Sequence, residues 1–197
     1  VTFGREITEN ESIRLLDIAV ENGINLFNTS YYYSDGISEK IIGKFFKIKK
    51  NRKDITIVSK IHGDLSKKTI EMCVHESLIR MNTDYIDYYG VTHDPNTNLD
   101  EILEVMDRFQ KEGKIIRVAC NNYDLSMLKS SKKIQEINKF SKFGLLETVY
   151  NVLYRGVEKD LINYCDLENI DIISYSPLGA GFITCLLYTS PSPRDLS

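Results

Sequence analysis

The sequence has few cysteines, and none of them lies in a disulfide-like or metal-binding pattern. Cys73, Cys120, Cys165 and Cys185 form no CxxC pair and show no Cys/His ligand spacing. Isolated cysteines of this kind are typical of reduced thiols in a cytoplasmic protein. We therefore expect a cytoplasmic protein without a metal site.

Membrane and secretion signals are also missing. The chain has no uninterrupted run of about 20 apolar residues, the length that a membrane-spanning helix needs. Even the apolar segment after Ile170 contains Asp171 and several serines. The N-terminal segment VTFGREITE has no basic lead followed by an apolar core, which a secretory signal would show. We expect no membrane span.

An excess of positive charge is absent as well. The formal net charge is -3, and the lysines and arginines are scattered along the chain. The run KIKKNRK at residues 47–53 is more typical of a solvated helix end than of a phosphate-binding track. With 197 residues, of which 42% are hydrophobic, the chain can bury one sizeable core. We expect a soluble globular protein that does not bind nucleic acid.

What the chain does contain is a repeating pattern. Apolar, β-rich runs recur roughly every thirty residues, with helical patterns between them. The predicted strands cover residues 24–27, 55–59, 85–91, 115–120, 145–150 and 171–175. The first helix begins after Thr8, which forms a capping box with Glu11, and ends at Gly23. The later helices cover residues 37–46, 66–81, 99–112, 133–140 and 158–167.

Two architectures fit this alternation of strand and helix. Strands that are apolar on both faces indicate a parallel sheet covered by helices. A doubly wound nucleotide-binding sheet would show a G-x-G-x-x-G turn after its first strand, and no strand here is followed by one. A barrel fits better, because its active sites lie at the strand ends where Asn28, Lys60 and Asn121 occur. Since a complete barrel needs about 250 residues, the sequence predicts an α/β fold that is an incomplete (β/α)8 TIM barrel.

Polar residues at consecutive strand ends predict an active site. Asn28 and Tyr33 follow the first strand, Lys60 follows the second and His93 the third. A phenol ionises near pH ~10, so Tyr33 is a poor acid at neutral pH unless a cation such as Lys60 stabilises the phenolate. Each residue alone has an ordinary interpretation, as an aromatic loop patch, a solvent-facing ion-pair partner or a rim histidine. Together they could protonate a carbonyl oxygen.

These residues lie in phrases that resemble the aldo-keto reductase family. The phrases are TFG at residues 2–4, GINLFNTSYYYSDGISEKIIGK at 23–44, ITIVSK at 55–60, IDYYGVTH at 86–93, GKIIRVACNNY at 113–123, VYNVLYR at 149–155 and YSPLGAGFIT at 175–184. They cover nearly the whole chain up to Thr184. The resemblance implies a barrel enzyme that reduces an aldehyde or ketone to an alcohol with NADP(H), or runs in reverse. Its partner would be a small-molecule carbonyl substrate.

The resemblance also implies a role for each site residue. Tyr33 would be the general acid, Lys60 would lower its pKa, and His93 would orient the substrate carbonyl, with Asn28 in the same catalytic set. The cofactor-binding residues would be Asn121, Asn122, Glu147, Tyr175, Ser176 and Leu178. Of these, Asn122 would bind the nicotinamide carboxamide and Tyr175 would stack on the nicotinamide ring.

Some positions depart from the family pattern. Asn28 stands where the family usually has an aspartate paired with the lysine, Glu147 where it has a glutamine, and Asn121 where it has a serine. Loss of a carboxylate beside Lys60 would lower the pKa of the lysine yet leave its charge less neutralised, so the net effect on Tyr33 is open in sign. The departures motivate an alternative, an NADP(H)-binding sensor or channel-associated subunit with little turnover. A Schiff-base lyase with Lys60 as nucleophile is a third hypothesis.

The family pattern breaks off near the end of the chain. YSPLGAGFIT usually continues with glycine and lysine, whereas here CLLYTSPSPRD follows, which resembles a translated sequencing adapter. A Ser/Pro-rich flexible tail is the alternative. We expect residues 1–184 to form a partial oxidoreductase barrel and residues 185–197 to be a non-native tail. Open sheet edges would favour aggregation or partial folding, and the chain alone would be inactive.

Overall fold

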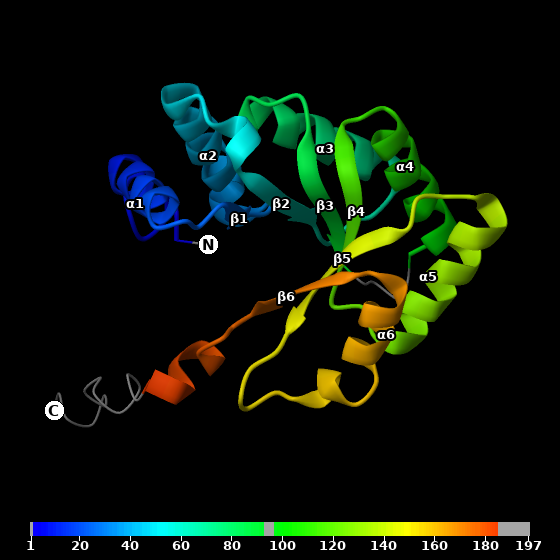
Figure 1. Ribbon diagram of the computed structural model, residues 1–197. Coiled ribbons are helices and arrows are strands. Elements are labelled where there is room, and N and C mark those ends of the chain that lie inside the picture. Colours follow the sequence, from blue (N-terminus) through cyan, green and yellow to red (C-terminus); the bar gives the residue numbers. More distant parts are fainter. Residues whose placement is uncertain (1, 93–96, 185–197) are drawn as a thin grey trace, which may run out of the picture.

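The computed structural model describes residues 2–92 and 97–184, which form one curled sheet with helices on its outer side (Figure 1). The strands are β1 (Leu26–Asn28), β2 (Thr56–Ile61), β3 (Ile86–Thr92), β4 (Ile115–Asn121), β5 (Phe143–Val149) and β6 (Asp171–Tyr175). Each strand pairs in parallel with the next one along the chain, in the order β1-β2-β3-β4-β5-β6. This arrangement confirms the predicted incomplete barrel.

Helices make the crossovers that parallel strands require. They are α1 (Glu9–Glu21), α2 (Ile37–Lys49), α3 (Lys67–Met81), α4 (Leu99–Lys111), α5 (Leu125–Asn138) and α6 (Leu161–Glu168). The capping box predicted for α1 is confirmed, because Thr8 Oγ1 accepts a hydrogen bond from the backbone N–H of Glu11 while the Glu11 carboxylate accepts one from the backbone N–H of Thr8.

Two helices begin three or more residues away from their predicted starts. α5 begins at Leu125 rather than near residue 133, because Asp124 caps it by accepting a hydrogen bond from the backbone N–H of Met127. Its buried face contains Ser and Gln beside a single leucine, so the apolar pattern that predicts a helix is weak there. α6 begins at Leu161 rather than at residue 158, because a 3-10 turn over Gly156–Glu158 precedes it.

The main hydrophobic core lies between the sheet and the helices. Ile57 of β2 points outward and is fully buried there with Phe45 of α2. Burial of one such side chain stabilises the fold by about 1.5–3 kcal/mol. A smaller cluster of Val58, Ala119 and Leu145 fills the concave side. Neighbouring residues of β2 thus point to opposite sides of the sheet, as the pleat requires.

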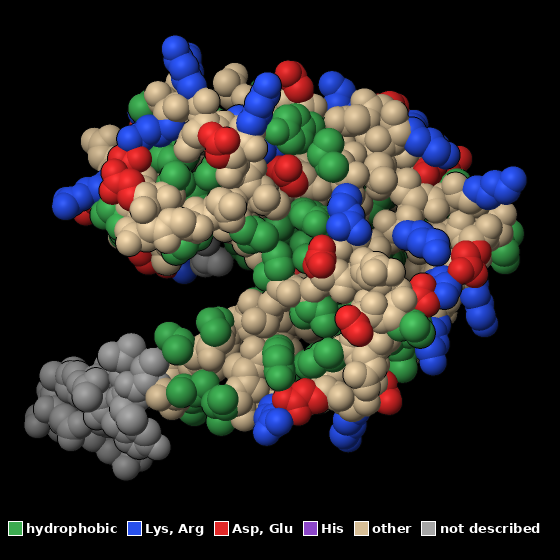
Figure 2. All heavy atoms as spheres, viewed as in Figure 1, with side chains coloured by type: hydrophobic (Ala, Val, Ile, Leu, Met, Phe, Trp, Pro, Cys, Tyr) green, Lys and Arg blue, Asp and Glu red, His purple; other side chains and the backbone are tan. Residues whose placement is uncertain are grey.

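The concave side is open between the two edge strands, β1 and β6. Figure 2 shows the opening as a deep notch on the left of the molecule. Along the edges, Leu26 of β1 is 39% exposed and Tyr175 of β6 is 36% exposed. Within the described ranges, no helix is long and apolar enough to cross a membrane. The predicted tail at residues 185–197 lies outside the described residues.

Candidate active site

A cavity of about 530 Å³ opens at the carboxyl ends of the strands, where the active sites of barrels lie. Its lining residues are Ser30, Tyr33, Lys60, His62, Thr92, Asn121, Asn122, Glu147, Tyr175 and Ser176. Most of the residues predicted for catalysis and cofactor binding are in this set. Of the others, Asn28 contacts Lys60, Leu178 is exposed outside the cavity wall, and His93 lies outside the described residues.

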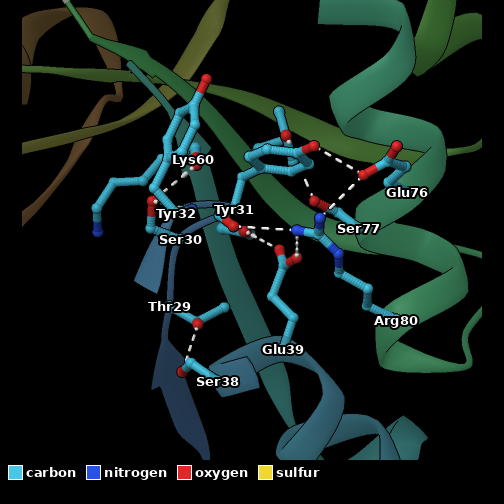
Figure 3. Close-up of polar contacts among 12 residues, drawn as sticks. Thr29, Ser30, Tyr31, Tyr32, Ser38, Glu39, Lys60, Glu76, Ser77 and Arg80 are labelled. Carbon is cyan, nitrogen blue, oxygen red and sulfur yellow. Dashed lines mark hydrogen bonds and ion pairs between the residues drawn. The ribbon is translucent and has the colours of Figure 1, made fainter. Parts of the chain in front are cut away.

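Lys60 points into the cavity because side chains alternate along β2. Ser59 faces the helices, and Lys60 extends to the opposite side of the strand (Figure 3). Its register partner on β3 is Gly90. A Cβ added at Gly90 would lie 2.2 Å from Oδ1 of Asn121 and 3.4 Å from Cβ of Lys60. The glycine therefore leaves the space in which this polar layer fits.

The Lys60 ammonium makes three hydrogen bonds, which use all of its donors. It donates to Oε1 and Oε2 of Glu147 at 2.9 and 2.8 Å and to Oδ1 of Asn28 at 2.7 Å. Asn28 Nδ2 also donates to Oε1 of Glu147 at 3.0 Å, and Asn121 Nδ2 donates to Oε2 at 2.6 Å. We call Asn28, Lys60, Asn121 and Glu147 the inner cluster.

The inner cluster corrects one expectation from the sequence. Asn28 suggested that Lys60 had lost its carboxylate partner and was less neutralised. In the structure Glu147 pairs with Lys60, and both residues are buried, with relative exposures of 4% and 8%. The expectation was wrong because a carboxylate is still present and reaches the ammonium from β5 rather than from β1.

Tyr33 begins a 3-10 turn (Tyr33–Gly36) at the end of the loop after β1, and this loop is anchored on Lys60. The backbone N–H of Tyr31 and the hydroxyl of Ser30 each donate to the carbonyl oxygen of Lys60 at 3.0 Å. The next residue, Ser34, has a φ of 51°, a strained conformation of the kind found at functional sites. Nζ of Lys60 lies 5.3 Å from the centroid of the Tyr33 ring, which is within range of cation–π attraction.

Burial and charge set the acidity of this pair. Burial raises the pKa of Tyr33, and the negative charge of Glu147 raises it further. Burial lowers the pKa of the Lys60 ammonium, and Glu147 opposes this decrease. The resemblance implies that Lys60 lowers the pKa of Tyr33; in the structure burial first, and then the charge of Glu147, leave this pKa raised. The phenol therefore keeps its proton at neutral pH.

Asn122 and Tyr175 form a second polar group on the cavity wall. Asn122 has a φ of 59°, and its Oδ1 accepts a hydrogen bond from the Tyr175 hydroxyl at 2.9 Å. Its backbone N–H donates to the carbonyl oxygen of Glu147 at 2.9 Å. Ser176 has a φ of 53°, and its carbonyl oxygen accepts from Asn151 Nδ2 at 2.9 Å. Two strained residues thus flank the ring of Tyr175.

The sequence analysis missed three lining residues, Ser30, His62 and Thr92. The His62 ring lies 4.5 Å from the Tyr32 ring, centroid to centroid. A signal for His62 was present, because it follows Lys60 by two residues and side chains two apart in an extended segment share a face. Thr92 carries no comparable signal.

A second charged group lies on the outer side of β2, between the sheet and helices α2 and α3 (Figure 3). Nη1 of Arg80 donates to the carbonyl oxygen of Tyr31 at 3.0 Å and to Glu39 at 3.3 Å, while Nη2 donates to Glu76 at 2.9 Å. The hydroxyl of Tyr31 donates to Glu76 at 2.7 Å. We call Tyr31, Glu39, Glu76 and Arg80 the outer cluster.

Glu39 is the most deeply buried member of the outer cluster, with 0% exposure. The hydroxyl of Ser59 donates to it at 2.8 Å. Burial raises the pKa of Glu39, against the opposing effects of Ser59 and Arg80. Because Arg80 also binds the backbone of Tyr31, the outer cluster ties α2 and α3 to the loop that carries Tyr33.

Comparison with known proteins identifies the family. A sequence profile described as "Aldo/keto reductase family" matches residues 1–196. The chain belongs to the aldo/keto reductase family. It is 28% identical to "Aldo-keto reductase AFTS1" of Alternaria alternata and 27% identical to "Methylglyoxal reductase YeaE" of Escherichia coli K12, over 89% of the chain in both cases. A solved aldo/keto reductase from Klebsiella pneumoniae, in complex with NADP and acetate, matches 92% of the chain with a TM-score of 0.81 at 25% identity.

This aldo/keto reductase chain spans less than two thirds of the length of those relatives. It covers 57% of the Alternaria protein, 61% of the Escherichia coli protein and 64% of the Klebsiella pneumoniae structure. The likeness to the solved enzyme agrees with the open sheet, in which consecutive parallel strands follow the curvature of a barrel without closing it.

Proposed function

We propose that the protein is an NADP(H)-dependent carbonyl reductase and that this chain carries its catalytic cavity. The observation that carries the proposal is the meeting of a protonated phenol, Tyr33, with the Lys60 ammonium in one cavity, with 5.3 Å between the ring centroid and Nζ. The substrate class is a small aldehyde or ketone. A methylglyoxal reductase among the relatives and a neighbouring structure with bound NADP support this assignment.

The cavity wall offers suitable groups for a nicotinamide. Oδ1 of Asn121 is buried and has no hydrogen-bond partner among the described residues, so it can accept a bond from an amide N–H. Tyr175 presents a partly exposed aromatic ring beside the amide of Asn122. When bound, NADPH would supply the hydride that reduces the carbonyl carbon.

Tyr33 supplies the proton in this proposal. As the carbonyl carbon receives hydride, negative charge develops on the oxygen. The O–H bond of Tyr33 then breaks, and its proton passes to that oxygen, which gives the alcohol and a phenolate. The Lys60 ammonium stabilises the phenolate. Because the pKa of Tyr33 is raised, its acid form is the one present before the transfer.

Replacement of the phenol tests the proposal. In the longest chain that the gene encodes, Tyr33→Phe should lower kcat for NADPH-dependent reduction of an aromatic aldehyde by about 10²–10⁴-fold, since the general acid is lost. NADPH affinity, measured by fluorescence titration, should change little. Tyr32→Phe is the matched control, because this neighbour is 39% exposed and does not line the cavity. Equal turnover by Tyr33→Phe and the parent would remove Tyr33 from the mechanism.

The two alternatives lose their motivation in this geometry. A Schiff-base lyase needs a nucleophilic amine, whereas the three donors of Lys60 are engaged by Asn28 and Glu147. The sensor hypothesis rested on the departures at Asn28 and Glu147, and Glu147 supplies a carboxylate to Lys60. Tight NADPH binding by the parent without turnover on any aldehyde or ketone tested would favour the sensor.

A further inference from the structure

Glu147 is a buried carboxylate surrounded by hydrogen-bond donors. Its Oε1 accepts bonds from Lys60 at 2.9 Å and Asn28 at 3.0 Å, and its Oε2 accepts from Lys60 at 2.8 Å and Asn121 at 2.6 Å. Its residual exposure is 4%. Charge-assisted bonds of this kind compensate a buried carboxylate for its loss of water. With both oxygens engaged twice, it has little capacity for a donor from a cofactor.

Lys60 has the reciprocal requirement. Within the described ranges, Glu147 is the only carboxylate at ion-pair distance from its ammonium, while Asn28 offers a dipole without a charge. A buried ammonium that lacks an anion favours its neutral form or moves toward water. Glu147 therefore governs both the charge and the position of Lys60.

We propose that Glu147 is the positioning residue that keeps Lys60 charged and in place beside Tyr33, and that positions 28 and 147 have exchanged their amide and carboxylate relative to the family pattern. This inference rests on the proposed function. A corollary is that the nicotinamide carboxamide is recognised by Asn121 and Asn122 and not by Glu147.

The geometry makes the two positions interchangeable. Oδ1 of Asn28 and Oε2 of Glu147 lie at nearly equal distances from Nζ of Lys60, 2.7 and 2.8 Å. Asn28 Nδ2 and Oε1 of Glu147 are 3.0 Å apart, so one direct hydrogen bond links the pair. Amide and carboxylate groups have the same shape, and a reciprocal exchange keeps both this bond and the net charge of the inner cluster. The negative charge moves from β5 to β1, and the bond from Lys60 to the oxygen that becomes the amide nitrogen at position 147 is lost.

A charge-swap cycle tests the inference in the longest chain that the gene encodes. The variants are Glu147→Gln, Asn28→Asp and the double Asn28→Asp/Glu147→Gln. Glu147→Gln leaves the Lys60 ammonium without an anion, and Asn28→Asp sets two carboxylates 3.0 Å apart, so each single variant should lower the urea midpoint of unfolding. The double variant should recover most of the loss. The midpoint of Glu147→Gln should also rise relative to the parent as the pH is raised toward 10.5, the ordinary pKa of the lysine, because a neutral Lys60 relieves the buried charge.

Turnover provides a second readout, measured in the longest chain that the gene encodes. Glu147→Gln should lower kcat on the order of 10²-fold, the effect expected when a catalytic group is misplaced by about 1 Å, with little change in KM for NADPH. The double variant should regain most of kcat, which a purely structural role for Glu147 does not predict.

Glu39→Gln is the matched control, because it also neutralises a buried carboxylate but lies on the outer side of β2. Its loss of stability should not be recovered by Asn28→Asp. The inference is overturned if the double variant is as impaired as the sum of the single ones, or if Glu147→Gln unfolds and turns over like the parent. Failure of the proposed function is separate, because it would leave the parent without turnover while the unfolding cycle still reports the coupling.

Discussion

Ser59 and Lys60, two neighbouring residues of β2, contact two ionic clusters whose surroundings differ. Lys60 enters the inner cluster, which borders a cavity of about 530 Å³. Ser59 enters the outer cluster, which is enclosed by α2 and α3. The same strand thus separates a charge that faces a binding space from a cluster whose most buried charge, Glu39, faces the helices.

The clusters also differ in how their charges are balanced. The inner cluster opposes one ammonium to one carboxylate, with asparagine amides completing the bonds. In the outer cluster, Arg80 meets two carboxylates and a backbone carbonyl, and its guanidinium lies 4.2 Å from the centroid of the Tyr31 ring. Both clusters are networks of several bonds, but the outer one binds the backbone of the loop before Tyr33, whereas the inner one places an ammonium 5.3 Å from the centroid of the Tyr33 ring. We therefore infer that the outer cluster supports the loop that leads to Tyr33 and that the inner cluster takes part in the chemistry.

The largest expected effect comes from breaking the outer cluster. Arg80→Met leaves Glu39 buried without its cation and removes the bond to the Tyr31 carbonyl. The free energy of unfolding should fall by about 3 kcal/mol, the range for removing one partner of a buried pair. Urea denaturation at neutral pH measures it. Arg108→Met is the control, because the side chain of Arg108 is 42% exposed in its ion pairs, and it should cost under about 1 kcal/mol. Equal losses in the two variants would show that the outer cluster is no more than a surface network.

A smaller effect is expected from crowding the inner cluster. Gly90→Ala places a methyl group 2.2 Å from the present position of Asn121 Oδ1, so Asn121 must turn away from Glu147. The free energy of unfolding should fall by about 1–3 kcal/mol, as for other overpacked sites, and kcat should fall with it. Gly156→Ala is the matched control, because a Cβ there has no neighbour within 4 Å, and it should change stability by less than about 0.5 kcal/mol. If Gly90→Ala had the same free energy of unfolding as the parent, the polar layer beside Asn121 would be able to accept a methyl group without strain.

The comparison also separates what the sequence could predict from what it could not. The period of apolar runs predicted the parallel half-barrel, because each run can bury only by pairing with the next one. The alternation of side chains along β2 and the family resemblance together predicted that Tyr33 and Lys60 would lie in one cavity. Both follow from local pattern, and the capping box at Thr8 was predictable for the same reason.

The ionic partners were beyond the reach of the sequence. Glu147 is 87 residues from Lys60 and meets it only through the register of strands β2 to β5. The outer cluster depends likewise on how α2 and α3 pack, and nothing in the spacing of Glu39 and Arg80, 41 residues apart, indicates a contact. The family pattern indicated position 28, which does bind Lys60 through Asn28, but it gave no sign that the carboxylate would come from Glu147.

The smallest expected effect is a difference in pH dependence between the two clusters. The pKa of Glu39 is raised in the folded state, so its contribution to stability is complete below its ordinary value of 4.5 and is lost as the pH rises through the folded value. The pKa of Lys60 is lowered, so its contribution is complete above 10.5 and is lost as the pH falls through the folded value.

Relative to Glu39→Gln, the parent should therefore lose stability as the pH rises from acid toward neutral. Relative to Lys60→Met/Glu147→Gln, which removes both inner charges, it should gain stability as the pH rises toward 10. Each slope is at most about 1.4 kcal/mol per pH unit, because one proton is exchanged. Urea midpoints across the pH range measure both, and two difference curves that change in the same window would contradict the separation of the clusters by β2.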